Sequence, residues 1–360
     1  MSKPYTPSDD AITVLSHLLL SPHDSETSRQ AQEISREKVE DLLALANTNH
    51  VIVRGLEVFL TIAYRAREEA RAHWAATALA AERYRIEKAI PFLHAICAAF
   101  EEDGHDATVI KSLDHWPDFG SDLDLYSNAR PADICTLMQR RFDARIASRS
   151  WGDRLACKWN FRIPGLTEAV EIHMGRLGQT GEQVSIASWL PARARLAMIG
   201  NYTFRVPAAS DRLMISVLQR MYRHFYFRLC DIVDTAKLSA SGAINYDDLQ
   251  SSAMAAGIWE GVATYLVIVS DYLNRYRGSG LDLPQFVRAS ARFGGNEVYL
   301  ARGFLRVPIM PQSARLYGSQ LTGLLRKLQL HNSARLGLLP WLATAAVVGQ
   351  KITGSDKGIW

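Results

Sequence analysis

The spacing of apolar residues changes character twice along the chain, and these two changes constrain the fold most. Up to about residue 103 apolar side chains recur at helical spacing, and after Pro207 the helical spacing returns. Between Ala107 and Met174 the chain instead has short runs that are rich in β-branched residues or alternate between polar and apolar. Such alternation is typical of a strand with one packed face. We therefore expect an α+β fold, in which a small mixed sheet is flanked by extensive N- and C-terminal helical regions.

Four short segments are the expected strands. A Pro164-Gly165 pair separates the last two and predicts a tight turn, so these two are expected to form a hairpin. A short helix is expected between the second and third strands, over 132–142. The strand segments are TVIKSL (108–113), DLDLY (122–126), ACKWNFRI (156–163) and EAVEIHM (168–174).

The flanking regions contain several expected helices. Pro91 suits the first turn of a helix, which predicts a separate helix over 91–102. Asp211 is a good N-cap for a helix that runs to about Leu238. Further helices are expected over 27–46, 51–70, 71–85, 259–276 and 319–330.

Length and composition fit this organisation. A chain of 360 residues is expected to hold about two domains' worth of structure. With 48% apolar and 22% charged residues, disordered, collagen-like and coiled-coil chains are excluded. We expect an N-terminal helical region at 1–103, a catalytic core at 104–205 and a C-terminal helical region at 206–360. The net charge is 41 − 37 = +4, which permits a nucleotide partner without favouring one.

The sequence gives no reason to expect a membrane or an oxidising compartment. The four cysteines lack CxxC spacing, so a zinc ribbon is not expected and the thiols should be reduced. The N-terminus lacks the basic stretch of a signal peptide. The longest nearly apolar stretch, 336–349, is 14 residues long and contains Pro340, whereas a bilayer-spanning helix needs about 20 residues. We expect a cytoplasmic protein that does not contact a membrane.

The segment Gly120-Ser121-Asp122-Leu123-Asp124 is the strongest candidate for a chemical site. Residues i and i+2 of a strand point to the same face, so Asp122 and Asp124 should project together. Two neighbouring carboxylates repel unless a cation lies between them, and Mg²⁺ is the hard ion that such ligands prefer. Gly120 allows backbone N–H groups to approach a phosphate, and Ser121 adds a hydroxyl donor.

A third carboxylate fits the same site. In EAVEIHM, Glu171 and His173 face away from the apolar pair Val170 and Ile172. If this strand lies beside DLDLY, Glu171 joins the two aspartates. Three carboxylates around two metal ions are the arrangement that two-metal phosphoryl transfer uses.

These residues resemble a known superfamily. GSDLDLY, followed some fifty residues later by an acid on a strand, resembles the nucleotidyltransferases that include DNA polymerase β and the aminoglycoside nucleotidyltransferases. The chain is most similar to bacterial nucleotidyltransferase-like proteins of poorly defined substrate, through VIKSLDHWPDFGSDLDLY, VEIHMGRLG and MYRHFYFRLCDIVDTA. The resemblance covers roughly 105–240, and Ser112 stands where the family often has glycine.

The resemblance implies an activity and a metal site. The reaction would be Mg²⁺- or Mn²⁺-dependent transfer of a nucleoside monophosphate from an NTP to an acceptor, with release of pyrophosphate. Asp122 and Asp124 would bind the metal and the triphosphate. Glu171 would be the third metal ligand or the base that activates the acceptor. Gly120 and Ser121 would hold the phosphates. The acceptor itself, whether a small molecule, an RNA or a protein, is not indicated.

The resemblance also implies a set of cations near the transferred phosphate. Lys111, Lys158 and Arg162 would neutralise phosphate charge, and His224 and Arg228 would face the site from the following helix. Each has an alternative role. Lys158 and Arg162 could form the wet face of a sheet, and His224 and Arg228 belong to a polar helical stripe that could face solvent or form an Arg228–Asp231 ion pair.

Two other functions compete with nucleotidyl transfer. A DxD motif is also the metal site of glycosyltransferases that use nucleotide sugars. A catalytically degenerate nucleotide-binding or interaction module would keep the fold without the reaction. His173 could line the site or serve the core, and Trp116 and Tyr126 could stack on a base or lie in the core.

Overall fold

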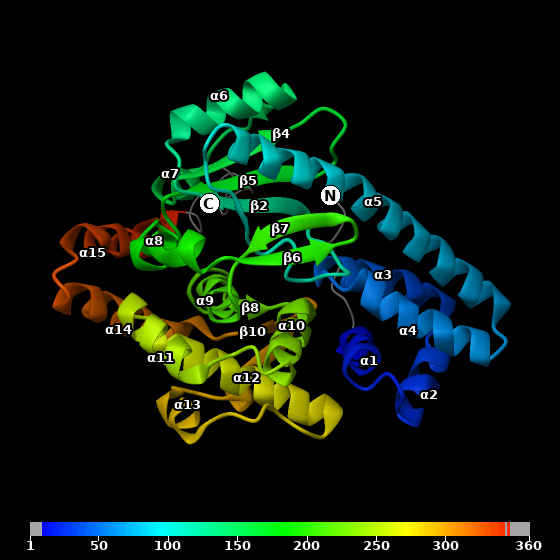
Figure 1. Ribbon diagram of the computed structural model, residues 1–360. Coiled ribbons are helices and arrows are strands. Elements are labelled where there is room, and N and C mark those ends of the chain that lie inside the picture. The colour runs from blue at the N-terminus through cyan, green and yellow to red at the C-terminus, as the bar shows by residue number, and fades with distance from the viewer. Residues whose placement is uncertain (1–8, 343, 346–360) are drawn as a thin grey trace.

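The computed structural model describes residues 9–342, 344 and 345 and has an α+β fold (Figure 1). The N-terminal segment in which no signal peptide is expected lies partly outside this range, as does the end of the apolar stretch 336–349. None of the described helices is long and apolar enough to cross a bilayer. All four cysteines are free thiols, and Cys97 and Cys230 are buried.

A five-stranded mixed sheet forms the centre of the molecule, with strand order β1-β2-β5-β4-β3. Only the β2–β5 pair is parallel, and the neighbouring β4–β5 pair is the expected antiparallel hairpin. The inward side chains of β2 and β5, such as Leu123, Leu125 and Ile172, are completely buried. The strands are β1 (Thr108–Val109), β2 (Asp122–Ser127), β3 (Arg145–Ile146), β4 (Lys158–Arg162) and β5 (Ala169–Met174).

Helices and a second hairpin cover this sheet. Helix α6 (Pro131–Phe142) lies at the top of Figure 1, close to the expected 132–142. Helix α7 (Trp151–Leu155) precedes β4, and α8 (Val184–Arg193) leads into the hairpin of β6 (Arg195–Ile199) and β7 (Tyr202–Val206). Strand β7 packs against β1 and against the long N-terminal helix α5 (Glu69–Glu102).

The N-terminal region is helical as expected, but two boundaries were predicted wrongly. The segment 27–46 is not one helix, because the chain breaks at Ile34 and the Ser35 hydroxyl caps the next helix by accepting a hydrogen bond from the Lys38 N–H. Helix α5 continues through Pro91 instead of restarting there. Since Pro91 and Glu87 are exposed, water can replace the hydrogen bond that the proline removes. The remaining helices are α1 (Asp9–Leu20), α2 (Ser25–Glu33), α3 (Arg36–Thr48) and α4 (Ile52–Arg65).

The expected helix from Asp211 to Leu238 is also wrong. Helix α9 (Ala209–Gln219) passes into a π-turn (Arg220–His224), the backbone reverses at Phe225 with φ of 54°, and a two-residue strand β8 (Tyr226–Phe227) precedes α10 (Leu229–Ala240). Strand β8 pairs with β10 (Phe304–Arg306), and buried Phe227 packs on Tyr265. Tertiary packing therefore overrides the helical spacing here.

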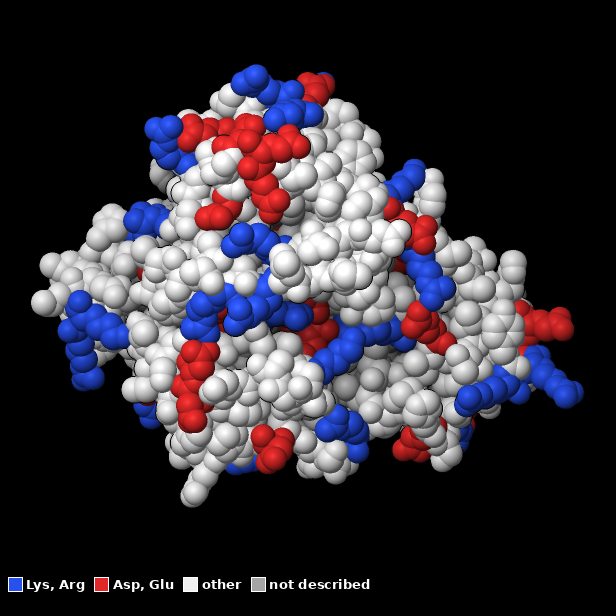
Figure 2. Space-filling model, viewed as in Figure 1, with Lys and Arg blue, Asp and Glu red and all other residues white. Residues whose placement is uncertain are grey.

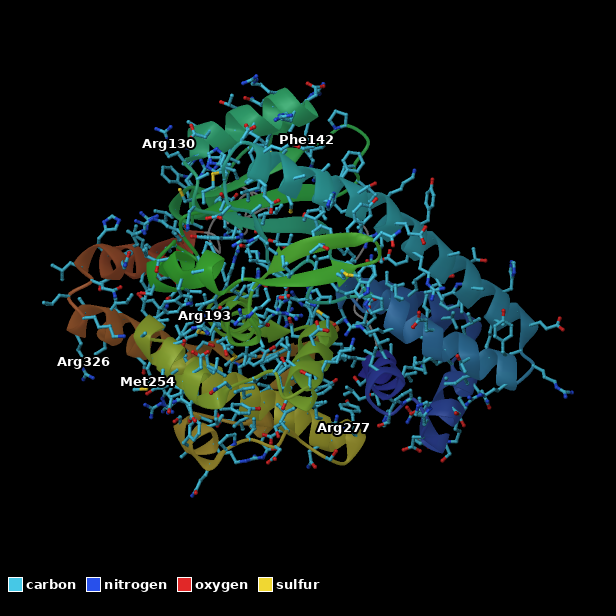
Figure 3. The ribbon with its side chains drawn as sticks, in the orientation of Figure 1. Arg130, Phe142, Arg193, Met254, Arg277 and Arg326 are labelled. Carbon is cyan, nitrogen blue, oxygen red and sulfur yellow. The ribbon has the colours of Figure 1, made fainter. Side chains whose placement is uncertain are left out.

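Asp211 is not an N-cap but a buried acid. Ala208 occupies the cap position, and Asp211 forms an ion pair with Arg193 at 3.1 Å. Arg193, labelled in Figure 3, also reaches Asp248 at 2.5 Å and so ties α8 to α11 (Tyr246–Ala256). The other C-terminal elements are α12 (Trp259–Arg277), α13 (Gln285–Ser290), β9 (Tyr299–Ala301), a π-helical segment (Ile309–Ser313), α14 (Ala314–Arg326) and α15 (Leu330–Gly337).

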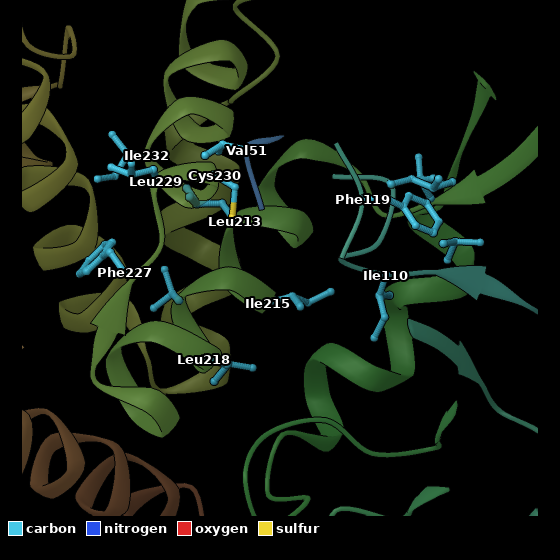
Figure 4. Close-up of a cluster of buried hydrophobic side chains, with 14 of the residues drawn as sticks. Val51, Ile110, Phe119, Leu213, Ile215, Leu218, Phe227, Leu229, Cys230 and Ile232 are labelled. Carbon is cyan, nitrogen blue, oxygen red and sulfur yellow. The ribbon is translucent and has the colours of Figure 1, made fainter. Parts of the chain in front are cut away.

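A single cluster of buried apolar side chains runs through all three predicted regions. Figure 4 shows where the sheet meets the C-terminal helices: Ile215 of α9 points toward Ile110, from the segment before β2, and Leu213 lies beside Cys230. This shared core holds the loop before β2 against the turn after α9, and the candidate site lies between these two segments.

Candidate functional site

The parallel pairing of β2 and β5 aligns the predicted acids. Asp124 lies directly opposite Glu171, and Asp122 lies opposite Ala169. Because alternate residues of a strand share a face, Asp122, Asp124 and Glu171 project from one face of the sheet, and the apolar residues between them pack on the other. The three carboxylates thus come from neighbouring positions on two strands, as the sequence predicted.

Lys111 places a positive charge between two of these acids. Its Nζ lies 2.5 Å from Asp124 Oδ1 and 3.3 Å from Glu171 Oε1. The residue adopts φ of 61°, a left-handed conformation that is rare for lysine, at the point where the chain leaves β1. The following Ser112 accepts a hydrogen bond from the Asp124 backbone N–H at 2.7 Å, which fixes this turn against β2.

Glu171 is surrounded by cationic and polar partners. Besides Lys111, it contacts Lys158 Nζ at 2.9 Å and His173 Nε2 at 2.9 Å. Lys158 is buried and also pairs with Asp153 at 2.8 Å. The structure therefore places Lys158 among acids behind the site rather than at a position facing a phosphate.

Burial and the neighbouring charges shift the pKa values of Asp124 and Glu171 in opposite directions. Burial, reinforced by Glu171, raises the pKa of Asp124 to about 7, although Lys111 opposes the shift. Burial also acts to raise the pKa of Glu171, but Lys111 and His173 outweigh it and hold that pKa well below the usual value. Burial and the Lys111 charge lower the pKa of His173 to about 4. A neutral imidazole therefore lies beside a carboxylate at pH 7.

Asp122 stands apart from this cluster. Its carboxylate accepts a hydrogen bond from Ser121 Oγ at 3.3 Å, and burial raises its pKa. Within the described part of the chain, the donor atoms that lie within 4.8 Å of one another on this face belong to Asp124, Glu171 and His173. The structure brings the predicted triad to one face, but His173 rather than Asp122 completes the close group.

A positively charged wall faces the acids. It is formed by the π-turn after α9 and the start of α10, through Arg220, Arg223, His224 and Arg228. The buried Arg220 pairs with Asp231 at 2.7 Å. The alternative role of Arg228, an ion pair with Asp231, is absent from the described residues, because the Arg228 backbone N–H, not its side chain, donates to Asp231 at 2.7 Å.

The guanidinium groups of Arg223 and Arg228 lie at the cavity, and Arg228 Nη1 is 3.4 Å from His50 Nδ1. Neither has a carboxylate partner among the described residues, and Arg228 Nε is buried without a hydrogen-bond partner. Burial and the neighbouring arginines lower the pKa of His224 and of His50, a further residue of this wall. We refer to His50, His173 and His224 as the site histidines, since all three are largely buried and held neutral.

The two walls enclose a polar cavity of about 240 Å³. Figure 2 shows blue side chains crossing the middle of the molecule, with a red group recessed between them. Of the predicted site residues, the cavity is lined by Lys111, Gly120, Ser121, Asp122, Asp124, Glu171, His224 and Arg228.

Besides Lys158, three candidates lie elsewhere. Arg162 is exposed at the end of β4 and donates to the Thr167 carbonyl at 3.3 Å. Trp116 is partly exposed outside the lining. Tyr126 is buried, and its hydroxyl donates to the Ala187 carbonyl at 2.7 Å, which is the core role.

Sequence reasoning missed several lining residues. His50 lies in the turn after α3, which the sequence marks only as a break between helices, and His115 lies in the loop before β2. Gln219 and Arg223 belong to the segment that was expected to be one regular helix. No local pattern distinguishes these residues, since they reach the site only through the tertiary fold.

Asp122 and Asp124 both line the cavity, and carboxylates are the ligands that Mg²⁺ prefers. Glu171 fits less directly, because Lys111, Lys158 and His173 already occupy its oxygens. Lys111 lies where a cation shared by Asp124 and Glu171 would lie. The site as described therefore suits one metal ion together with the Lys111 ammonium.

Comparisons with known proteins add no assignment. No protein-family model matches the chain, and no curated protein is significantly similar to it in sequence. The resemblance to nucleotidyltransferases thus depends on the motif residues alone and stays a prediction.

Proposed function

We propose that this protein is a Mg²⁺-dependent nucleotidyltransferase that transfers a nucleoside monophosphate from an NTP to an acceptor and releases pyrophosphate. One observation carries the proposal. Asp122 and Asp124 face a cavity whose opposite wall holds Arg223 and Arg228, arginines without carboxylate partners among the described residues. An acidic metal site opposite unpaired arginines suits a metal-bound polyphosphate.

The chain's own residues supply positioning and charge. Arg228 and Arg223 would hold the β- and γ-phosphates, since guanidinium groups bind phosphate oxygens in pairs. The Gly120-Ser121 segment would donate hydrogen bonds to the same phosphates from the other side. Mg²⁺ at Asp122 and Asp124 would neutralise the developing charge on the phosphate oxygens. Catalysis would then consist of alignment and electrostatic stabilisation.

We assign Glu171 to charge balance rather than to proton transfer. A carboxylate contacted by Lys111, Lys158 and His173 is a weak base, as its lowered pKa indicates. Its part would be to hold Lys111 beside Asp124 and so to orient the carboxylate that binds the metal. The acceptor, whether a small molecule, an RNA or a protein, enters from the same cavity.

Position-specific labelling of the nucleotide tests this function. NTPs labelled at the α- or the γ-phosphate are incubated with the protein, Mg²⁺, and separate pools of small metabolites, RNA and protein. The proposal predicts transfer of the α-label alone, lost in Asp124→Asn and kept in the matched surface variant Asp133→Asn, because Asp133 pairs with Arg130, the residue before α6, outside the cavity lining.

The same experiment separates the alternatives. Transfer of the γ-label would indicate a kinase and contradict the proposal. A labelled sugar transferred from a UDP- or GDP-sugar, with no transfer from NTPs, would favour the glycosyltransferase. Nucleotide binding without transfer to any pool would favour a degenerate binding module.

A further inference from the structure

A second cluster of ligating side chains adjoins Gly120. His50, His115 and Cys230 come from three distant parts of the sequence, yet one donor atom from each lies within 4.8 Å of the other two. His50 belongs to the turn between α3 and α4, His115 to the loop before β2, and Cys230 to the first turn of α10. The proposed reaction uses none of these three groups.

The donor types differ from those of the acidic site. Two imidazole nitrogens and one sulfur form a borderline-soft set, which suits Zn²⁺ and related transition ions, whereas Mg²⁺ requires oxygen ligands. The two clusters would therefore select different metals although both adjoin one cavity.

The surroundings of His115 match those of a metal-binding histidine. Its Nδ1 lies 2.5 Å from Asp234 Oδ2, and Asp234 is held in turn by Arg54 at 2.8 Å. A carboxylate on one ring nitrogen fixes the orientation of the ring and directs the other nitrogen toward the ion. Here the other nitrogen, Nε2, lies 3.8 Å from Cys230 Sγ.

The cluster is buried at Cys230 and open to the cavity at His50 and His115. Cys230 is completely buried among apolar side chains (Figure 4), so its sulfur is out of reach of a large electrophile, which argues against a nucleophilic role. His50 and His115 line the cavity and give a small ion access. His50 also adopts φ of 53°, and its ring lies against Gly120, where an added Cβ would approach the ring at 3.4 Å.

From this geometry we infer that His50, His115 and Cys230 bind one zinc-type transition-metal ion, with a fourth position open to the cavity. The ion would join the α3–α4 turn, the loop before β2 and α10, which together carry Gly120 and Arg228. Arg228 Nη1 lies 3.4 Å from His50 Nδ1, so an ion held by that nitrogen requires the guanidinium to turn away. The inference is independent of the proposed function.

Cobalt substitution of the full chain tests this site without any enzymatic assay. The protein is treated with a chelator, dialysed, and titrated with Co²⁺ while its absorption spectrum is recorded. If the site binds the ion, about one Co²⁺ should bind per chain and give an ultraviolet thiolate-to-cobalt charge-transfer band. The visible bands should have the high intensity that is typical of tetrahedral Co²⁺. Added Zn²⁺ should abolish these bands by displacing the Co²⁺.

Matched variants locate the ligands. Cys230→Ser should remove the ultraviolet band, while Cys135→Ser, a partly buried thiol on α6, should retain it. His50→Gln should weaken Co²⁺ binding at least tenfold, and circular dichroism confirms that each variant is folded. Asp234→Asn, which changes the positioning residue, should weaken binding about 10–100-fold but keep the band.

The inference would be overturned by the absence of a thiolate band in the folded wild-type protein. It would also be overturned if the band survived in folded Cys230→Ser, or if His50→Gln left the Co²⁺ affinity unchanged. In either case the ion would lie elsewhere.

Discussion

Replacing Lys111 with methionine tests whether its ammonium acts as a built-in cation between two acids. Methionine keeps an unbranched chain but removes the charge. In surroundings with an effective dielectric constant of about 20, attraction across 2.5 Å to Asp124 and 3.3 Å to Glu171 is worth about 7 and 5 kcal/mol. The cost of burying the ammonium offsets much of this attraction. Breaking such a buried pair typically lowers the free energy of unfolding by about 3–5 kcal/mol.

Mg²⁺ should reverse much of that loss. In the variant a divalent ion can take the place of the ammonium, and a ligand at 100 times its dissociation constant adds about 2.7 kcal/mol to the free energy of unfolding. Wild-type protein should gain less from Mg²⁺, because Lys111 already balances the acids. The assay is urea unfolding at pH 8 in a chelator and in Mg²⁺, for the wild type, Lys111→Met and Lys327→Met.

Lys327 is the matched control, since it is exposed and donates to the backbone carbonyls of Met254 and Ala255, with no carboxylate partner among the described residues. Its replacement should change the free energy of unfolding by less than about 1 kcal/mol in either buffer. A loss in Lys111→Met that is equally large with and without Mg²⁺ would refute the reasoning, as would a loss below about 1 kcal/mol.

Three further predictions concern neighbouring groups. Lys158→Met should cost about 3–5 kcal/mol in urea unfolding, and Mg²⁺ should not restore it, because Lys158 contacts Asp153 and Glu171 behind the cavity; restoration by Mg²⁺ would place Lys158 in the cation site. Arg228→Gln should weaken NTP binding about 10–100-fold by calorimetry, since a charged hydrogen bond is worth about 1.5–3 kcal/mol, whereas equal weakening in Arg162→Gln would contradict the assigned wall. Acidification from pH 6.5 to 5 should lower the free energy of unfolding, because the site histidines take up protons only on unfolding, while Asp122 and Asp124, whose pKa values are raised in the folded protein, oppose part of that loss. His224→Gln should make that dependence shallower by up to about 1.4 kcal/mol per pH unit, and an unchanged slope would show that His224 is not held neutral.

The acidic face could be predicted because it depends on strand periodicity alone. The two-residue repeat places Asp122 and Asp124 together, and the alternation in EAVEIHM separates Glu171 from the buried Val170 and Ile172. One further assumption, that β2 and β5 are neighbours, brings Glu171 opposite Asp124, and the register confirms that assumption.

The basic wall could be predicted only in part because a helical repeat does not reveal a break that packing imposes. The stripe of His224 and Arg228 was expected on one regular helix. Instead, the pairing of β8 with β10 and the packing of Phe227 on Tyr265 interrupt the helix between them. Both residues still reach the cavity, but by way of a π-turn and the start of a new helix.

Contacts between distant segments could not be predicted from local patterns. Lys158 alternates onto the polar face of β4 as expected, yet Asp153 and Glu171 draw it into a buried ion pair. His50 and His115 lie in loops 65 residues apart and meet only because the α3–α4 turn packs against the segment before β2, where Asp118 accepts a hydrogen bond from the Val53 N–H.

The central claim is that Asp122 and Asp124 bind a metal-complexed nucleoside triphosphate, and its most direct test is nucleotide binding by thermal unfolding. Each NTP is added with and without Mg²⁺ to the wild type, to the Asp122→Asn/Asp124→Asn double variant and to Asp133→Asn. We predict that saturating NTP with Mg²⁺ raises the midpoint by several degrees in the wild type and in Asp133→Asn. The double variant should show no such rise. Equal stabilisation of the double variant, or none of the wild type by any NTP, would contradict the assigned site.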